Sequence, residues 1–153
     1  MQSLFHLHVL KAFSQVIADY ELSPMVESED LIYLVSAKTY ALSISNDRYG
    51  INIWYLYLKS RDEILSYNIL VEASRTRPRL DPSEGLTENP TSLDDQLGNY
   101  ARMLVRDAPD ALDGDMTWLG AVGQPVRHSP SASAKLHDCL QGALPRAIST
   151  RDK

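Results

Sequence analysis

The chain has 153 residues, of which 44% are hydrophobic and 23% are charged, and its formal net charge is −5. This length indicates a single domain, and the composition argues against wholesale disorder. The charge is uneven, because residues 1–120 hold 18 acidic and 10 basic residues, a net −8, whereas residues 121–153 hold 2 acidic and 5 basic residues. A net charge of −8 over residues 1–120 disfavours nucleic-acid binding and favours a basic protein partner.

The sequence also lacks the marks of secretion and of membrane insertion. Its one cysteine, Cys139, excludes an intrachain disulfide framework and fits a reducing compartment. No apolar run approaches the roughly 18–20 residues that a membrane helix needs. The apolar stretch Leu4–Leu10 is interrupted by His6 and His8, and no basic region precedes it. We therefore expect a cytoplasmic protein without membrane contact.

The first predicted element is a helix over residues 4–20. Apolar side chains recur there at spacings of three and four, which is typical of an amphipathic helix; they are Leu4, Val9, Leu10, Phe13, Val16, Ile17 and Tyr20. Ser23-Pro24 is expected to stop the helix. On a helix, His6 and His8 diverge by about 200°, so we predict a structural or surface role for them and no shared metal.

In the next part of the chain the apolar pattern changes from helical spacing to the strand-like period of two residues. Leu31–Ala37 is a short apolar run, Tyr40–Ser45 alternates between apolar and small residues, and Ile51–Leu58 is rich in aromatic and β-branched residues. These runs predict a three-stranded antiparallel meander with a hairpin at Asn46–Gly50. Residues 60–75 combine a capping box with strand-like alternation, which predicts a fourth strand or a short helix–strand mix.

The second half of the chain contains one clear helix. Residues 74–91 have no period and predict an exposed linker. Residues 92–107 predict a helix capped by Thr91 or Ser92, with Asp113–Asp115 forming a turn after it. Beyond residue 120, Gly, Pro and Ser are frequent, and only a weak helix near Ala132–Leu140 is indicated.

Together these elements predict an α+β fold. It has an N-terminal helix, an antiparallel sheet of three to four strands, a C-terminal helix packed on the sheet and an irregular tail. Residues 1–120 are expected to form the domain, and residues 121–153 a loosely structured or disordered tail.

The sequence carries no recognisable catalytic, cofactor or metal motif. The phosphate-binding, dinucleotide-binding, nucleophile-elbow and zinc-protease patterns are all missing, and Cys139 has no convincing His or Asp constellation. The acids between residues 107 and 115 lack the spacing of a calcium loop. We therefore predict no enzyme activity, no cofactor and no metal.

The candidate partner-binding residues are acidic and aromatic, with one arginine. Asp47 and Arg48 sit on the predicted hairpin, and alternation places Trp54 on one face of its strand with Tyr55 and Tyr57 on the other. Turn and cap roles, or core packing, are the simpler interpretation of these residues, and a contact surface is the functional one. The complete predicted set is Asp47, Arg48, Trp54, Asp110, Asp113, Asp115 and Trp118.

The layout resembles small bacterial α+β proteins that include the immunity proteins of contact-dependent and other polymorphic toxin systems. The resemblance covers residues 4–119 and is carried by the N-terminal helix, the turn with Asp47-Arg48, and Leu112, Gly114, Asp115 and Trp118 late in the chain. It implies a protein that binds a cognate toxin and blocks its active surface. The acidic body favours a basic nuclease domain as that toxin.

We therefore predict a cytosolic immunity protein that acts as a monomer or weak homodimer. The alternative is a secretion chaperone or another small adaptor that binds an effector segment, for which a stable dimer would be expected. A third alternative is a small enzyme or ligand-binding domain, which a deep pocket with converging polar groups would favour.

Overall fold

The computed structural model describes residues 3–48, 50–69, 92–118 and 124–144. The helices are α1 (Leu4–Ala12), α2 (Ser14–Asp19), α4 (Leu93–Asp107), α5 (Pro109–Leu112) and α6 (Pro130–Gln141). The strands are β1 (Ser23–Ser28), β2 (Leu31–Val35), β3 (Tyr40–Asp47), β4 (Gly50–Ser60), β5 (Glu63–Asn68) and β6 (Val126–Arg127). None of the helices in these ranges is both long enough and apolar enough to cross a membrane.

The predicted α+β class is confirmed, but the expected number of strands was too low. Within the described residues the sheet has six antiparallel strands in the order β1-β2-β3-β4-β5-β6. The three strands of the meander are β2, β3 and β4, and the fourth strand predicted within residues 60–75 is β5. The additional strands β1 and β6 lie at the two edges.

The strand β1 begins where the sequence predicted only the end of a helix. The helical segment ends at Asp19, and Ser23 and Pro24 open β1. All side chains of β1 are exposed or half-exposed, so the strand carries no alternating apolar pattern. A proline at an edge is tolerated because its missing N–H need not reach a second neighbouring strand.

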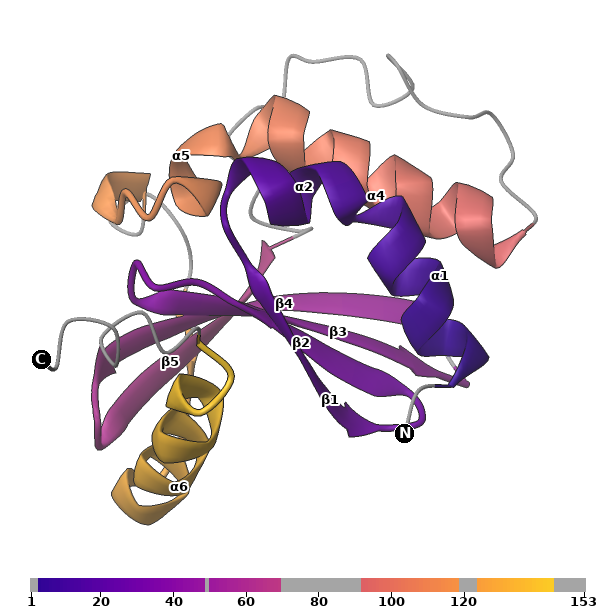
Figure 1. Ribbon diagram of the computed structural model, residues 1–153. Helices are drawn as coiled ribbons and strands as arrows, with labels where there is room; N and C mark the ends of the chain where they lie inside the picture. The colour runs from indigo at the N-terminus through magenta and orange to yellow at the C-terminus, as the bar shows by residue number, and fades with distance from the viewer. Residues whose placement is uncertain (1–2, 49, 70–91, 119–123, 145–153) are drawn as a thin grey trace, which may run out of the picture.

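Two hydrophobic cores lie on the two faces of the sheet. Figure 1 shows α1, α2, α4 and α5 above the sheet and α6 below it. The larger core contains Phe5, Val9 and Phe13 from the N-terminal helices together with Leu97 and Leu104 from α4. The smaller core joins Leu140 of α6 to Val35, Leu58 and Ile64 of the sheet. The sheet is therefore buried on both faces near its centre.

The predicted N-terminal helix forms with one break, at Phe13. This residue ends α1 and precedes α2 with φ −99° and ψ 10°, and its backbone N–H donates to the carbonyl of Val9 at 2.8 Å. Its own carbonyl accepts from the N–H of Ile17 at 2.8 Å, and its side chain is completely buried. The helix therefore breaks at a residue whose side chain is buried in the larger core.

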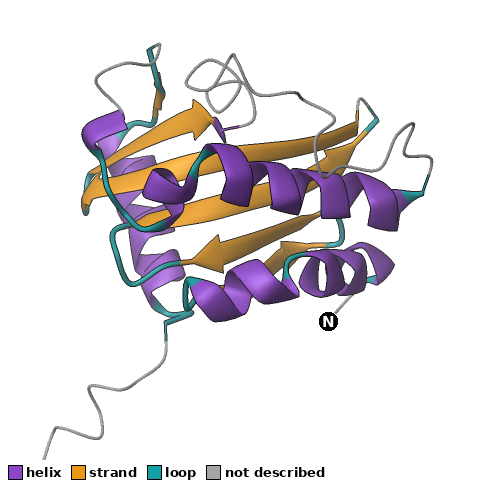
Figure 2. Cartoon of the chain, turned by 90° about the horizontal axis from the view of Figure 1, so that it is seen from above, coloured by secondary structure: helices purple, strands orange, loops and turns teal. Residues whose placement is uncertain are grey.

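The predicted helix at residues 92–107 is confirmed as α4, the long helix that lies over the sheet in Figure 2. The hydroxyl of Ser92 accepts from the N–H of Asp95 at 3.0 Å, which identifies Ser92 as its cap. Asp94 in its first turn pairs with His8 and lies 3.4 Å from Nζ of Lys11. The hydrogen bond from His8 is the main reason why the pKa of Asp94 is lowered.

The weak helix indicated near Ala132–Leu140 is confirmed as α6, whereas the expectation of an irregular tail was wrong for residues 124–144. Val126 and Arg127 form β6, which pairs with Leu65 and Ser66, and residues 130–141 form α6. The hydroxyl of Ser129 caps α6 by accepting from the N–H of Ala132 at 3.2 Å. A short helix with Leu136 and Leu140 as its main apolar contacts is enough to cover part of one sheet face. The linker predicted at residues 74–91 lies outside the described residues.

Candidate functional site

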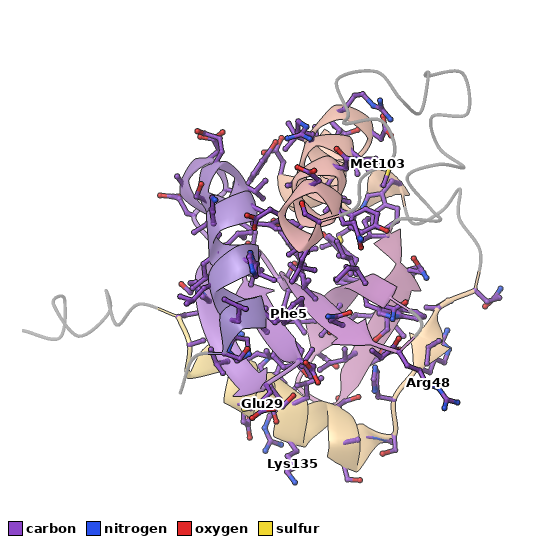
Figure 3. The ribbon with its side chains drawn as sticks, turned by 90° about the vertical axis from the view of Figure 1, so that its right-hand side faces the viewer. Phe5, Glu29, Arg48, Met103 and Lys135 are labelled. Atoms are coloured by element: carbon purple, nitrogen blue, oxygen red, sulfur yellow. The ribbon has the colours of Figure 1, made fainter. Side chains whose placement is uncertain are left out.

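The predicted site residues fall into three separate regions of the molecule. Asp47 and Arg48 lie at the β3–β4 hairpin, which is confirmed by the pairing of Asp47 with Gly50. Both side chains are exposed, and Nδ2 of Asn52 donates to Oδ2 of Asp47 at 3.1 Å. Figure 3 looks onto this end of the sheet, where Arg48 and Glu29 both appear.

The three predicted aspartates at residues 110–115 lie at the other end of the sheet, next to α5. We call Asp110, Asp113 and Asp115 the acidic turn; all three side chains are exposed. Tyr40, at the first position of β3, contacts this region, whereas Asp47 lies seven residues further along the strand. At about 3.3 Å per residue this separates the hairpin from the acidic turn by roughly 23 Å. One small contact surface does not contain both.

Two buried tyrosines attach the acidic turn to the sheet. The hydroxyl of Tyr40 donates to the carbonyl of Leu112 at 2.6 Å, and that of Tyr55 donates to the carbonyl of Ala111 at 2.8 Å. Both phenol rings are completely buried and stacked, with centroids 4.7 Å apart. Both carbonyls lie at the end of α5, where intrahelical partners run out, and that of Ala111 also accepts from the N–H of Gly114 at 3.1 Å. The backbone below the three carboxylates is thereby fixed.

The backbone conformation and close packing at residue 114 explain why a glycine stands inside the acidic turn. Its φ is +82°, a conformation that side chains rarely adopt, and an added Cβ would lie 2.9 Å from Cβ of Lys38 and 3.2 Å from the Lys38 carbonyl oxygen. The N–H of Asp115 then donates to the carbonyl of Asp110 at 2.9 Å and closes the turn. The close approach to Lys38 fixes the turn against the β2–β3 connection.

The carboxylate of Asp115 caps the short turn that follows, as the sequence predicted. Its Oδ1 accepts from the N–H of Thr117 at 3.0 Å. Hydrogen bonding from the backbone and then from the side chain of Thr117 lowers the pKa of Asp115. The acidic turn therefore presents a carboxylate that stays charged at neutral pH and whose position is set by the backbone.

Trp118 lies in the core and forms only a minor part of the surface. Its ring meets Tyr55 edge-on at 5.2 Å and Tyr67 at 5.6 Å, and it packs against the larger core. Its Nε1 is buried and hydrogen-bonds to none of the described residues. Of the late residues on which the resemblance was based, Leu112, Gly114 and Asp115 thus build the acidic turn, and Trp118 packs beside Tyr55, which holds it.

The two buried tyrosines make stability sensitive to high pH. Burial raises the pKa of Tyr40 and Tyr55 above the ordinary value of 10.0. Because unfolding lets them ionise, their stabilising contribution is complete below about pH 10 and falls as the pH rises above it, by up to about 1.4 kcal/mol per pH unit for each tyrosine. Urea unfolding at about pH 9 and pH 11 should show this loss, and it should be smaller when both residues are phenylalanine. An equal loss in that variant would contradict the assignment.

The last predicted site residue, Trp54, lies on the opposite face of the sheet, under α6. As the alternation predicted, Tyr55 and Tyr57 pack in the larger core and Trp54 in the smaller one. Near Trp54, the Oγ of Ser66 lies 2.7 Å from Nε2 of His128. Sequence reasoning missed this pair, because 62 residues separate its members and His128 was assigned to the tail.

His6 and His8 have the structural roles that the helical spacing predicted. Nδ1 of His6 accepts from the N–H of Ser3 at 2.8 Å, so its proton lies on Nε2, which donates to the carbonyl of Ser28. His8 binds Asp94 on α4. In the described parts of the chain, no three His, Cys, Asp or Glu side chains converge as metal ligands would.

Comparison of the chain with protein-family models, with curated proteins and with solved structures found no match.

Proposed function

We propose that this chain is an immunity protein that binds a cognate bacterial toxin and covers its active surface. The observation that carries the proposal is the acidic turn: three exposed carboxylates on a backbone that Tyr40 and Tyr55 fix from below. A preorganised charged surface loses little conformational freedom on binding, so more of its interaction energy appears as affinity.

The charge of the acidic turn suits a basic target. Carboxylates held at fixed positions occupy the places where a nuclease would bind substrate phosphates, and they attract a basic surface at long range. The net charge of −8 over residues 1–120 adds to this attraction. The expected partner is a toxin domain with clustered Lys and Arg at its active surface.

The edges of the sheet give less support to the alternative, a chaperone that captures an extended effector segment. Strand addition needs a free edge with available backbone donors and acceptors. The edge strand β1 contains Pro24, which has no N–H, and exposed Glu27. The other edge strand, β6, has two residues. Both features discourage pairing with another strand.

Charge reversal of the acidic turn is the direct test. The chain and the polypeptide encoded immediately beside it would be co-purified, and their affinity measured by calorimetry at two salt concentrations. The triple variant Asp110→Lys, Asp113→Lys, Asp115→Lys should weaken binding on the order of 100-fold or more and abolish protection of cells that express the toxin. Higher salt should weaken the unmodified complex as well.

A matched control places the same change of charge at the far end of the sheet. The variant Glu27→Lys, Glu29→Lys, Asp30→Lys alters three exposed acids near the β1–β2 turn and should retain binding and protection. Equal loss in both triple variants would indicate a net-charge effect and would remove the acidic turn as the contact surface. Absence of any complex would remove the proposed function.

A further inference from the structure

A cavity lies between α6 and the sheet face opposite α1 and α4, away from the acidic turn. Its volume is about 290 Å³, and its apolar walls are Tyr33, Trp54, Leu56 and Leu136. Val126, whose exposed fraction is 52%, stands at its rim. The helix α6 covers only the part of this face around Ser133 and Leu140, so the cavity begins where the cover ends.

Two hydrogen-bonded polar side chains, Ser66 and His128, lie among these apolar walls. Ser66 is 5% exposed, and its Oγ is hydrogen-bonded to Nε2 of half-buried His128 at 2.7 Å. The β5–β6 pairing positions both groups, because Ser66 pairs with Val126 and His128 follows two residues later. A hydroxyl bonded to an imidazole nitrogen still offers a donor or a free lone pair to a third group.

The residues that line the cavity determine which ligand charge it favours. Besides the pair, its polar groups are the hydroxyls of Ser43 and Tyr33, and among the described residues that line it none carries a carboxylate, ammonium or guanidinium group. A charged ligand would lose hydration there without gaining an opposite charge, whereas a neutral group can be matched by hydroxyls and an imidazole. The cavity therefore favours a neutral molecule.

The volume of the cavity and its aromatic walls further limit the class of ligand. An apolar cavity of about 150 Å³ holds one benzene ring, so a cavity of about 290 Å³ has room for roughly two fused rings. The side chains of Trp54 and Tyr33 provide aromatic surfaces on which a planar molecule packs well.

We propose that this cavity is a binding site for a small, neutral, planar molecule of about two fused rings, whose hydrogen-bonding edge contacts the Ser66–His128 pair. The site is separate from the toxin-binding surface proposed above, since it lies on the other face of the sheet. It places a ligand between β5 and the consecutive elements β6 and α6, which lie far from β5 in the sequence.

The test uses the full chain, labelled with ¹⁵N, and three probes: 2-naphthol, naphthalene and 2-naphthoate. 2-Naphthol should give saturable NMR shifts at the Trp54 indole N–H and at residues around Ser66 and His128. Naphthalene, which lacks the hydroxyl, and 2-naphthoate, which is charged, should bind more weakly. Ser66→Ala should weaken 2-naphthol binding about 5-fold and leave naphthalene binding unchanged.

Two substitutions on α6 form a matched pair. Leu136→Trp fills the cavity and should abolish the shifts, whereas Lys135→Trp adds the same ring at an exposed neighbouring position, labelled in Figure 3, and should leave them intact. Ser43→Leu narrows the cavity from the sheet side and provides a second test should Leu136→Trp fail to fold. Absence of saturable shifts, shifts that survive both filling variants, or tighter binding of 2-naphthoate would overturn the proposal.

Discussion

Replacement of Phe13 by alanine is expected to lower the free energy of unfolding by about 3–5 kcal/mol. The Phe13 side chain is completely buried in the larger core and lies at the break between α1 and α2. Its removal leaves a cavity that the surrounding residues fill only in part, because two helices and the sheet meet around it. Urea unfolding followed by circular dichroism measures the change.

The control for Phe13→Ala is Leu7→Ala on the same helix. Leu7 is 50% exposed, so the same shortening to alanine should change stability by no more than about 0.5 kcal/mol. If the two variants unfold at the same urea concentration, Phe13 does not anchor the N-terminal helices as described.

The second large effect is expected from the double variant Tyr40→Phe, Tyr55→Phe. It removes two buried hydroxyls, which leaves the carbonyl of Leu112 without this partner and that of Ala111 with only the N–H of Gly114, at a cost of about 2–4 kcal/mol. Because those bonds hold α5, toxin binding should weaken as well, although no carboxylate has changed. Unfolding measurements and calorimetry on the same variant separate the two effects.

Tyr57→Phe is the matched control for the tyrosine pair. Tyr57 lies on the same strand and the same face as Tyr55 but is only half-buried. Its substitution should change stability by less than about 0.5 kcal/mol and leave affinity unaltered. A double variant as stable as this control would show that the two hydroxyls do not fix the acidic turn.

The sequence was sufficient to predict the elements that bury a regular apolar pattern. The stripe at residues 4–20 forms α1 and α2, the alternation in β3 and β4 places Tyr55 and Trp54 on opposite faces, and Ser92 caps α4. In each of these cases a local period or a cap is enough to determine the structure.

The edge strands were harder to predict because they bury little, and α6 was indicated only as a weak helix. β1 is exposed along its length, and β6 is two residues long with both side chains exposed. Such strands form because their backbones pair with a neighbouring strand. Backbone pairing produces no residue pattern that can be recognised in a single sequence. For α6 a signal was present, since Ser129 followed by Pro130 is a typical helix start.

The candidate sites show the same division between local and long-range information. The turn at Asp113–Asp115 was predictable because its chemistry is local. The separation of Asp47 from that turn, and the meeting of Ser66 with His128, depend on strand pairing between distant parts of the chain. Composition and spacing contain no information about either.

Because strand order in the sheet equals chain order, each strand from β2 to β5 pairs with the one made just before it as the polypeptide leaves the ribosome. Such short-range pairing favours rapid formation of this five-stranded part of the sheet, to which β6 is added later. The larger core closes only when α4 has been synthesised, since Leu97 and Leu104 complete it. Until then one apolar face stays open to solvent, so a chain stalled before α4 would be prone to aggregation.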